Sequence, residues 1–423
     1  MGARERLEAG PSARLRIGFF GVFYPGSERA GSFSTSLVWE LARSSRVERV
    51  HVYGPTGARR PDGGDPRRLA VEEAWAADDP LSLLRALARM WRARRTTDAY
   101  LFSIYVTAFG RRSIANVVGL LLPPILRIAA RRPVFVYMHN FLETQDSETL
   151  GFRVGRLTKT GVRLLERTLI ALTRVVVPLR SMQTVVEREV GGRVEVLLLP
   201  YLEALFAATR PGVAPASSMA APPLPPLRVL LFGYWGPQKD LTGALDVLGG
   251  LAAEGCPLDV TVAGEANPGF PEYRERLERA KGSLPVERFH FVGRVDEEEV
   301  FPLVRRHHLL LLPYRATGGI SGVMNVGALA DLDLLAYDVP QLREFSGELG
   351  ERVRFVPAGD SSALREAILA EVTRRASRGG KEDLFQEHVA TARAGVERLV
   401  DRMVSPGRPL EVRSGPPRHD VAN

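Results

Sequence analysis

The segment from Leu309 to Asn325 constrains the fold more strongly than any other part of the chain. It begins with four consecutive leucines, a short apolar run typical of a strand that is buried on both faces of a parallel sheet. Pro313 ends this run, and the glycines at 318, 319 and 322 allow a sharp turn and close backbone approach to a ligand. A helix is predicted to follow over residues 320–330, so its N-terminal amides would face the loop. The pattern therefore predicts an anion-binding loop.

The composition is that of a globular protein with more than one domain. The 423 residues predict two or three domains, and 45% apolar residues suffice for their cores. The single cysteine, Cys256, excludes an internal disulfide, which suits a reducing compartment. The net charge of +8 favours acidic partners such as nucleotide diphosphates, anionic lipid or nucleic acid. Only four of the 57 basic residues are lysines, so a lysine beside a predicted ligand loop merits attention.

Neither a signal peptide nor a membrane span is expected. Residues 1–14 are polar and charged and lack the apolar core of a signal. The most apolar stretch, Val117 to Leu126, contains Pro123-Pro124 and is followed by Arg127, so it should be too short to cross a bilayer. Cytoplasmic residence is therefore expected.

Strands alternate with helical patterns in two halves of the chain. The first half is predicted to contain strands at 15–21, 50–53, 99–102, 134–137, 175–177 and 194–199, with a helix over 34–43 after the first strand. The second is predicted to contain strands at 227–232, 258–263, 289–292, 309–312, 334–337 and 353–356. Such alternation predicts two parallel sheets covered by helices, with a ligand cleft beyond the carboxyl ends of the strands.

The predicted domain organisation follows from this alternation. We expect a disordered N-terminus over 1–14, a Rossmann-like domain over 15–210 and a proline-rich linker over 211–226. A second Rossmann-like domain is expected over 227–382. A C-terminal helix over 383–405 has one apolar face, and a disordered tail over 406–423 would follow.

The chain resembles the retaining, nucleotide-sugar-dependent glycosyltransferases of the GT-B fold, in particular glycosyltransferase family 4. The resemblance covers most of residues 15–405 and is carried by three segments. Leu230 to Leu241 is similar to the first strand and turn of the family's second domain, Phe291 to Val300 to its nucleotide-side strand and helix, and Pro313 to Asn325 to its donor-diphosphate loop.

The resemblance implies that the domain over 15–210 binds the acceptor and that the domain over 227–382 binds the nucleotide sugar. It also implies roles for particular residues. Lys239, with Gly233 in the same turn, would contact the donor diphosphate and offset the charge that develops as the nucleotide leaves. His139 would face the transferred sugar from the first domain. The remaining donor-binding residues that it implies are Gly31, Ser32, Gly319, Ile320, Ser321, Gly322 and Asn325. An isolated lysine or histidine can equally be structural, so both readings stay open for Lys239 and His139.

The chain departs from the family at two positions. The paired glutamates that bind sugar and ribose in the commonest family members are replaced here by Gly318 and Val326, whose side chains cannot accept a hydrogen bond. Some relatives carry a Gly-x-Ser-Gly loop similar to Gly319–Gly322, and Asn325 could supply part of the missing contact. The sequence does not show whether this loss abolishes activity.

The expected function is transfer of a sugar from a nucleotide diphosphate to a glycan, lipid-linked or small-molecule acceptor, retaining and independent of metal or other cofactors. The alternative is a catalytically weakened GT-B protein that binds nucleotide or partners an active transferase in a glycan-assembly complex. Asp331-Leu332-Asp333 imitates a metal-binding Asp-x-Asp motif, but it would lie at the sheet edge opposite to the cleft. The scattered arginines do not form the basic stripe of a nucleic-acid-binding protein.

A contact with membrane is a further expectation. Arg111, Arg112, Arg127, Arg131 and Arg132 flank the apolar stretch, which would give a basic and partly amphipathic face able to rest on anionic lipid. A buried helix with ordinary flanking charges is the alternative reading.

Overall fold

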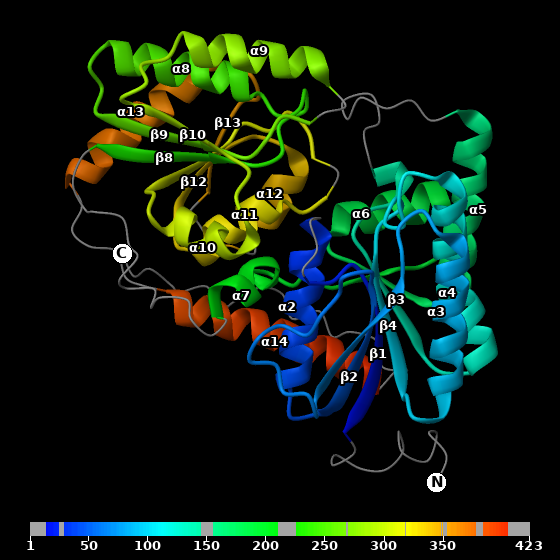
Figure 1. Ribbon diagram of the computed structural model, residues 1–423. Helices are drawn as coiled ribbons and strands as arrows, with labels where there is room; N and C mark the ends of the chain where they lie inside the picture. The colour runs from blue at the N-terminus through cyan, green and yellow to red at the C-terminus, as the bar shows by residue number, and fades with distance from the viewer. Residues whose placement is uncertain are drawn as a thin grey trace, which may run out of the picture.

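The computed structural model describes residues 14–24, 29–144, 155–209, 226–267, 270–317, 319–347, 349, 353–377 and 384–404. These residues form two α/β domains, each with a parallel sheet between helical layers (Figure 1). Most of the predicted linker, the N-terminal segment and the C-terminal tail lie outside the described residues.

The first domain has, within the described residues, a seven-stranded sheet in the order β3-β2-β1-β4-β5-β6-β7. Its strands are β1 (Leu15–Gly21), β2 (Val47–Pro55), β3 (Leu69–Trp75), β4 (Ala99–Ile104), β5 (Val134–Met138), β6 (Arg174–Val177) and β7 (Glu195–Val196). Its helices are α2 (Arg29–Arg43), α3 (Pro80–Arg92), η1 (Ala93–Arg95), α4 (Ser113–Ala130), η2 (Leu142–Thr144), α5 (Arg156–Leu172), α6 (Arg180–Val185), η3 (Val186–Val190) and α7 (Leu202–Thr209).

The second domain has, within the described residues, a six-stranded sheet in the order β10-β9-β8-β11-β12-β13. Its strands are β8 (Leu227–Phe232), β9 (Leu258–Ala263), β10 (Phe289–Gly293), β11 (Leu309–Leu312), β12 (Asp333–Tyr337) and β13 (Val353–Val356). Its helices are α8 (Leu241–Ala253), α9 (Pro271–Gly282), α10 (Glu297–Arg305), α11 (Gly322–Leu329), α12 (Pro340–Ser346) and α13 (Ser361–Ser377), and α14 (Phe385–Val404) follows.

Both sheets are parallel, so the loops that follow the central strands meet at one edge. The four leucines of β11 are fully buried and pair with β8 on one side and β12 on the other. In both sheets the chain order reverses next to the first strand of the domain, between β1 and β4 and between β8 and β11. Ligands of open α/β sheets bind at this kind of crossing point.

One prediction about the first domain is wrong. Pro123 and Pro124 do not break the apolar stretch, because α4 continues through both as an 18-residue helix. Burial of Leu120, Leu122 and Leu126 in the core offsets the cost of proline inside a helix, about 3 kcal/mol. By length and composition α4 is therefore one helix that could cross a membrane, although 44% of it is buried in the domain.

Smaller differences also have physical causes. The edge strand β3 was not predicted. Its buried and exposed residues do not alternate regularly, and two glutamates interrupt its apolar pattern. The strand expected over 194–199 is reduced to the two residues of β7, and α2 begins five residues earlier than expected. The predicted C-terminal helix is present as α14.

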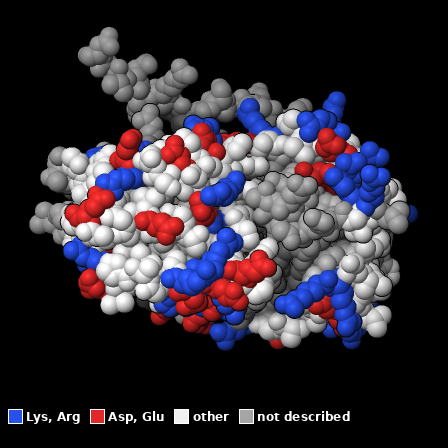
Figure 2. All heavy atoms as spheres, turned by 90° about the horizontal axis from the view of Figure 1, so that it is seen from above, with Lys and Arg blue, Asp and Glu red and all other residues white. Residues whose placement is uncertain are grey.

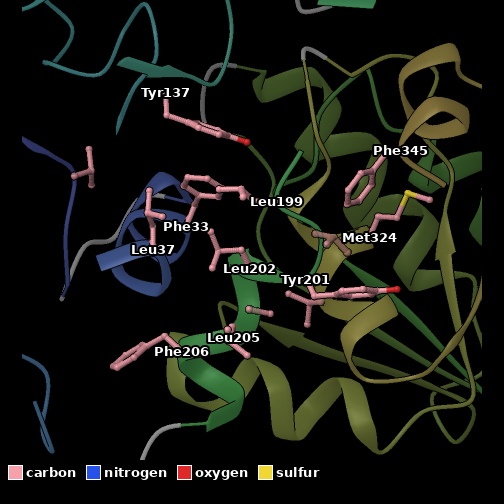
Figure 3. Packing of buried hydrophobic residues seen from close by; sticks show 14 of the residues in the cluster. Phe33, Leu37, Tyr137, Leu199, Tyr201, Leu202, Leu205, Phe206, Met324 and Phe345 are labelled. Atoms are coloured by element: carbon pink, nitrogen blue, oxygen red, sulfur yellow. The ribbon is translucent and has the colours of Figure 1, made fainter. Parts of the chain in front are cut away.

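The two domains pack together through α7 and α14. Helix α7 contacts α2 of the first domain and both α10 and α11 of the second. Figure 3 shows Leu202 and Leu205 of α7 lying between Leu37 of α2 and Met324 of α11. Helix α14 runs back from the second domain and contacts α2 and α7, so the C-terminal segment holds the first domain as well as the second (Figure 1).

Candidate functional site

The loops after β8 and β11 are joined at the carboxyl edge of the second sheet. Lys239 and Tyr314 form an isolated bridge, the Asp240 amide donates to the Pro313 carbonyl at 2.7 Å, and the Arg315 amide donates to the Gln238 carbonyl at 2.9 Å. The lysine turn and the glycine-rich loop, predicted separately from the sequence, therefore form one structure. Their strands β8 and β11 are neighbours on either side of the crossing point.

The Lys239 side chain is 5% exposed and lies among aromatic rings. Its Nζ is 4.4 Å from the centroid of Tyr314 and 5.5 Å from that of Trp235. A Cβ at Gly233 would lie 2.7 Å from this Nζ, so a residue with a side chain could not occupy the end of β8 without displacing the ammonium group. Gly233 thus leaves room for the Lys239 ammonium group. The sequence did not suggest this role for Gly233.

An ion pair between Arg315 and Asp240 links the same two loops. The Arg315 Nη2 donates to Asp240 Oδ2 at 2.8 Å, and this hydrogen bond raises the pKa of Arg315. The Tyr337 hydroxyl, at the end of β12, donates to the same carboxylate oxygen at 3.3 Å. Arg315 and Asp240 were not predicted as site residues, although both lie within the segments that carry the resemblance, 230–241 and 313–325. The pair fixes the position of the loop after β11 relative to the start of α8.

The N-terminus of α11 lies beyond this loop. Ser321 is its N-cap residue, and its Oγ accepts a hydrogen bond from the Met324 amide at 3.2 Å. The Asn325 side chain is buried one turn further on, and its Oδ1 has no hydrogen-bond partner among the described residues. Val326 is buried in the apolar core, and Gly318 lies outside the described residues. Helix N-termini of this kind favour anions, which the Ser321 hydroxyl and the amides of Ile320 and Gly322 could bind.

In the first domain, His139 lies at the carboxyl end of β5 and ends a chain of hydrogen bonds. Its Nε2 is 2.9 Å from the Ser103 Oγ, which in turn accepts from the Ser34 hydroxyl at 2.9 Å. The ring packs edge-on against Phe33, with centroids 4.6 Å apart. The two serines come from α2 and β4, are buried and were not found in the sequence, where nothing distinguishes them from other serines.

Burial lowers the pKa of His139 to about 4, so its imidazole is neutral at neutral pH. A neutral ring can donate or accept a single hydrogen bond but brings no positive charge to a ligand.

The two domains meet where these groups lie. A Cβ at Gly319, in the loop after β11, would be 3.0 Å from the backbone oxygen of His139, so the loop and the end of β5 are in close contact. Gly31 and Ser32 lie in the first turn of α2, the same turn that carries Phe33 and Ser34 towards His139. The structure therefore brings the predicted residues of both domains to one junction.

The Asp-x-Asp motif is engaged elsewhere. Asp333 opens β12, at the amino edge of the sheet, and forms a buried ion pair with Arg374 of α13. Asp331 has a positive φ of 65° and lies 3.7 Å from the Nε2 of His388 in α14. Among the described residues, no group of three or more His, Cys, Asp or Glu side chains could hold a metal ion. Both aspartates hold neighbouring helices in place.

Comparison with known proteins establishes the fold. No protein-family model matches the chain, and no curated protein matches it by sequence. Among solved structures, sucrose-phosphate synthase from Thermosynechococcus elongatus is 14% identical to this chain, with a TM-score of 0.60. The match covers 92% of this chain and 96% of the synthase chain. HepE from Anabaena, in complex with UDP-glucose, is 16% identical with a TM-score of 0.55 and covers 92% and 96%. WaaG, a glycosyltransferase involved in lipopolysaccharide biosynthesis, is 13% identical with a TM-score of 0.54 and covers 92% and 100%.

The fold is GT-B. This confirms the fold class predicted from the sequence. It also explains why the loops of both domains meet at one junction, because the GT-B architecture sets the carboxyl edges of two parallel sheets against each other. At these identities the likeness shows the fold alone, and what the chain binds has to be argued from its own residues.

Proposed function

We propose that this protein transfers a sugar, a hexose by the resemblance to family 4, from a nucleoside diphosphate to an acceptor. The observation that supports this most directly is the junction at which Lys239, the N-terminus of α11 and His139 come together from two domains. A related fold has been solved with UDP-glucose bound, so a nucleotide sugar is a suitable ligand for such a junction.

The proposed roles follow from charge and position. Lys239, Arg315 and the α11 amides would neutralise the diphosphate, which would make donor binding independent of metal and of any other cofactor. His139, being neutral, would orient the sugar by a hydrogen bond. Retention of the anomeric configuration is proposed on the resemblance alone, as are the donor-binding roles of Gly31, Ser32 and Asn325. Residence in the cytoplasm is proposed on the composition, because a chain with Cys256 as its single cysteine suits a reducing compartment.

A second candidate is a GT-B protein that binds nucleotide but no longer transfers sugar efficiently. It is favoured by the valine at 326, which is buried in the core and offers no hydrogen bond to a ligand. Basic and acidic side chains are interspersed over the second domain when it is seen from above (Figure 2), which does not favour nucleic acid as the partner.

Nucleotide binding is the first test. One of UDP, GDP and ADP should raise the melting temperature, because a ligand that binds only the native state stabilises it by mass action. Because protein groups supply the positive charge, the shift should be the same with EDTA. A shift that is lost with EDTA and restored by Mn²⁺ would contradict metal independence and leave the nucleotide site itself intact.

Substitution of Lys239 is the second test. Lys239→Ala should lower donor turnover roughly 10²-fold, since a preorganised charge on a departing phosphate is commonly worth about 3 kcal/mol. Lys281→Ala is the matched control, because that lysine is half exposed on α9 and pairs only with Glu278 among described carboxylates. Turnover by the wild type that disappears in Lys239→Ala rejects the binding-only alternative. Nucleotide binding without any consumption of donor sugar rejects the transferase.

A further inference from the structure

The outer helical layer of the first domain has an unusual surface. Helices α3, α4 and α5 pack side by side, with α4 in the middle. They cover the face of the sheet that is turned away from the second domain, opposite to α2 and α14 (Figure 1). We call the surface formed by residues 80–95, 111–132 and 156–174 the outer helical face.

Large apolar side chains are exposed along this face. On α4 they form one stripe at helical spacing, which the half-buried Leu121 completes: Ile114, Val117, Ile125 and Ile128. Two of them, Ile114 and Ile128, are more than 60% exposed. The neighbouring helices add exposed residues to the same layer: Leu81, Leu84 and Trp91 on α3, and Leu164 and Leu172 on α5. Leu81 and Leu84 also line an open, shallow depression with Arg85 and Ala88. Exposed apolar side chains that gather on three neighbouring helices indicate an interaction site.

The same face is strongly basic. Its three segments contain fifteen Lys and Arg residues and one acidic residue, Glu166. Glu166 is fully buried, and this burial raises its pKa to about 7, so it does little to offset the positive charge. The whole chain has a net charge of only +8, so the remainder of the molecule contains more acidic than basic residues. The positive charge is therefore concentrated on this face and is not a uniform consequence of composition.

Several of these cations are available to a partner. Arg85, Arg163 and Lys159 form ion pairs with Asp79 and Glu143. By contrast, no ion pair within the described part of the chain engages Arg92, Arg111, Arg112, Arg127 or Arg131, all of which are exposed. In addition, the Arg94 guanidinium lies 4.0 Å above the ring of Trp91, an aromatic and basic pair suited to the boundary between water and lipid.

We propose that the outer helical face docks the protein on the surface of an anionic lipid bilayer, with α4 lying in the plane of the interface. Exposed apolar residues enter the boundary between headgroups and acyl chains, while the surrounding arginines bind the anionic headgroups. A protein or nucleic-acid partner fits this face less well. The face combines an apolar stripe with surrounding positive charge, and an anionic bilayer offers the matching combination of apolar acyl chains beneath negative headgroups.

Helix α4 lies on the bilayer and does not cross it. Its inward side, with Ala115, Leu120 and Leu126, belongs to the core of the first domain. A spanning α4 would have to leave that core and expose it to water. This inference is independent of sugar transfer, since it rests on residues remote from the junction of Lys239 and His139.

Flotation with vesicles tests the proposal on the full chain. Wild-type protein should float with vesicles of phosphatidylglycerol and phosphatidylcholine at low salt, and not with phosphatidylcholine alone. Two double variants test the face: Ile114→Ser/Ile128→Ser and Arg111→Glu/Arg127→Glu. Each should bind the anionic vesicles more weakly than the wild type, by a factor of about ten or more. The matched controls are on the second domain: Val286→Ser/Val292→Ser, at exposed valines, and Arg274→Glu/Arg279→Glu, at exposed arginines of α9. Both should bind as the wild type does.

Circular dichroism and melting temperature would show that each variant is folded. Failure of the wild type to float with either vesicle overturns the proposal. So does equal binding by the wild type and both face variants, or binding to neutral and anionic vesicles alike. Self-association of the wild type that the face variants lose, without flotation, would instead identify the face as a contact between two copies of the chain.

Discussion

At the scale of single residues, the site is built more from buried neighbours than from exposed ligand groups. His139 was predicted as an isolated histidine after a strand, and that position is correct. The sequence does not indicate Ser34 and Ser103, because hydroxyls 36 residues or more away from His139 approach it only when α2, β4 and β5 assemble. Lys239 is likewise buried by Trp235 and Tyr314, of which only the first is near it in sequence.

The neutral His139 leads to a prediction about turnover. His139→Ala should reduce donor turnover while changing nucleotide affinity little, because the ring lies in the first domain and the residues proposed to bind the diphosphate lie in the second. His290→Ala, at a half-exposed histidine of the edge strand β10, should leave both unchanged. Steady-state kinetics and nucleotide titration would separate the two effects. An equal loss of affinity and turnover in His139→Ala would place His139 outside the sugar site.

The pKa of His139 also predicts how stability varies with pH. In the unfolded chain this histidine binds a proton near its ordinary pKa of 6.5, whereas in the folded protein it does so only near 4. Because the unfolded state binds the extra proton between these values, the stability associated with His139 should be lost as pH falls from 6.5 towards 4. The difference in melting temperature between the wild type and His139→Ala should therefore narrow from pH 7 to pH 5. A constant difference would contradict a neutral, buried ring.

At the scale of elements, strands buried on both faces were the easiest to predict, because apolar runs such as Leu309–Leu312 are short and end at turn residues. The edge strand β3 was missed because two glutamates interrupt its apolar pattern, whereas the edge strands β10 and β13 were predicted. Helix α4 shows the opposite failure, since a local rule about proline was overridden by packing against the sheet. Local sequence thus predicts an element well when all sides of the element have the same surroundings, as for a strand buried on both faces.

Helix α11, which follows the glycine-rich loop, permits a test of how closely it packs against strands β11 and β12. A Cβ at Gly327, in α11, would lie 2.4 Å from Leu310 Cδ2 and 2.9 Å from Leu334 Cδ2, so Gly327→Ala should destabilise the protein by about 1–3 kcal/mol. The same substitution at Gly250, an exposed position in α8 with nothing within 4 Å, should stabilise it by up to about 1 kcal/mol. Thermal unfolding would measure both. Equal effects would mean that α11 is not held against β11 and β12 as described.

At the scale of the whole molecule, the sequence predicted two similar halves but not how they are joined. Alternating strands and helices indicate each domain separately, and nothing in the apolar face of the C-terminal helix shows which domain it covers. In the structure α14 crosses back to the first domain, where the Arg393 Nε donates to the buried carboxylate of Glu40 in α2 at 2.9 Å. Such long-range contacts depend on the final arrangement of the domains.

This contact carries the last prediction. Arg393→Ala should destabilise the protein by about 1–2 kcal/mol, because it leaves Glu40 buried without that partner, while the partial exposure of Arg393 limits the loss. Glu40→Gln in the same background should recover part of the stability, since a neutral amide costs less to bury. Arg398→Ala, at an exposed position on the same helix, is the control and should change the melting temperature little. If Arg393→Ala and Arg398→Ala behave alike, α14 does not hold the first domain through Glu40, and its apolar face alone would account for the packing.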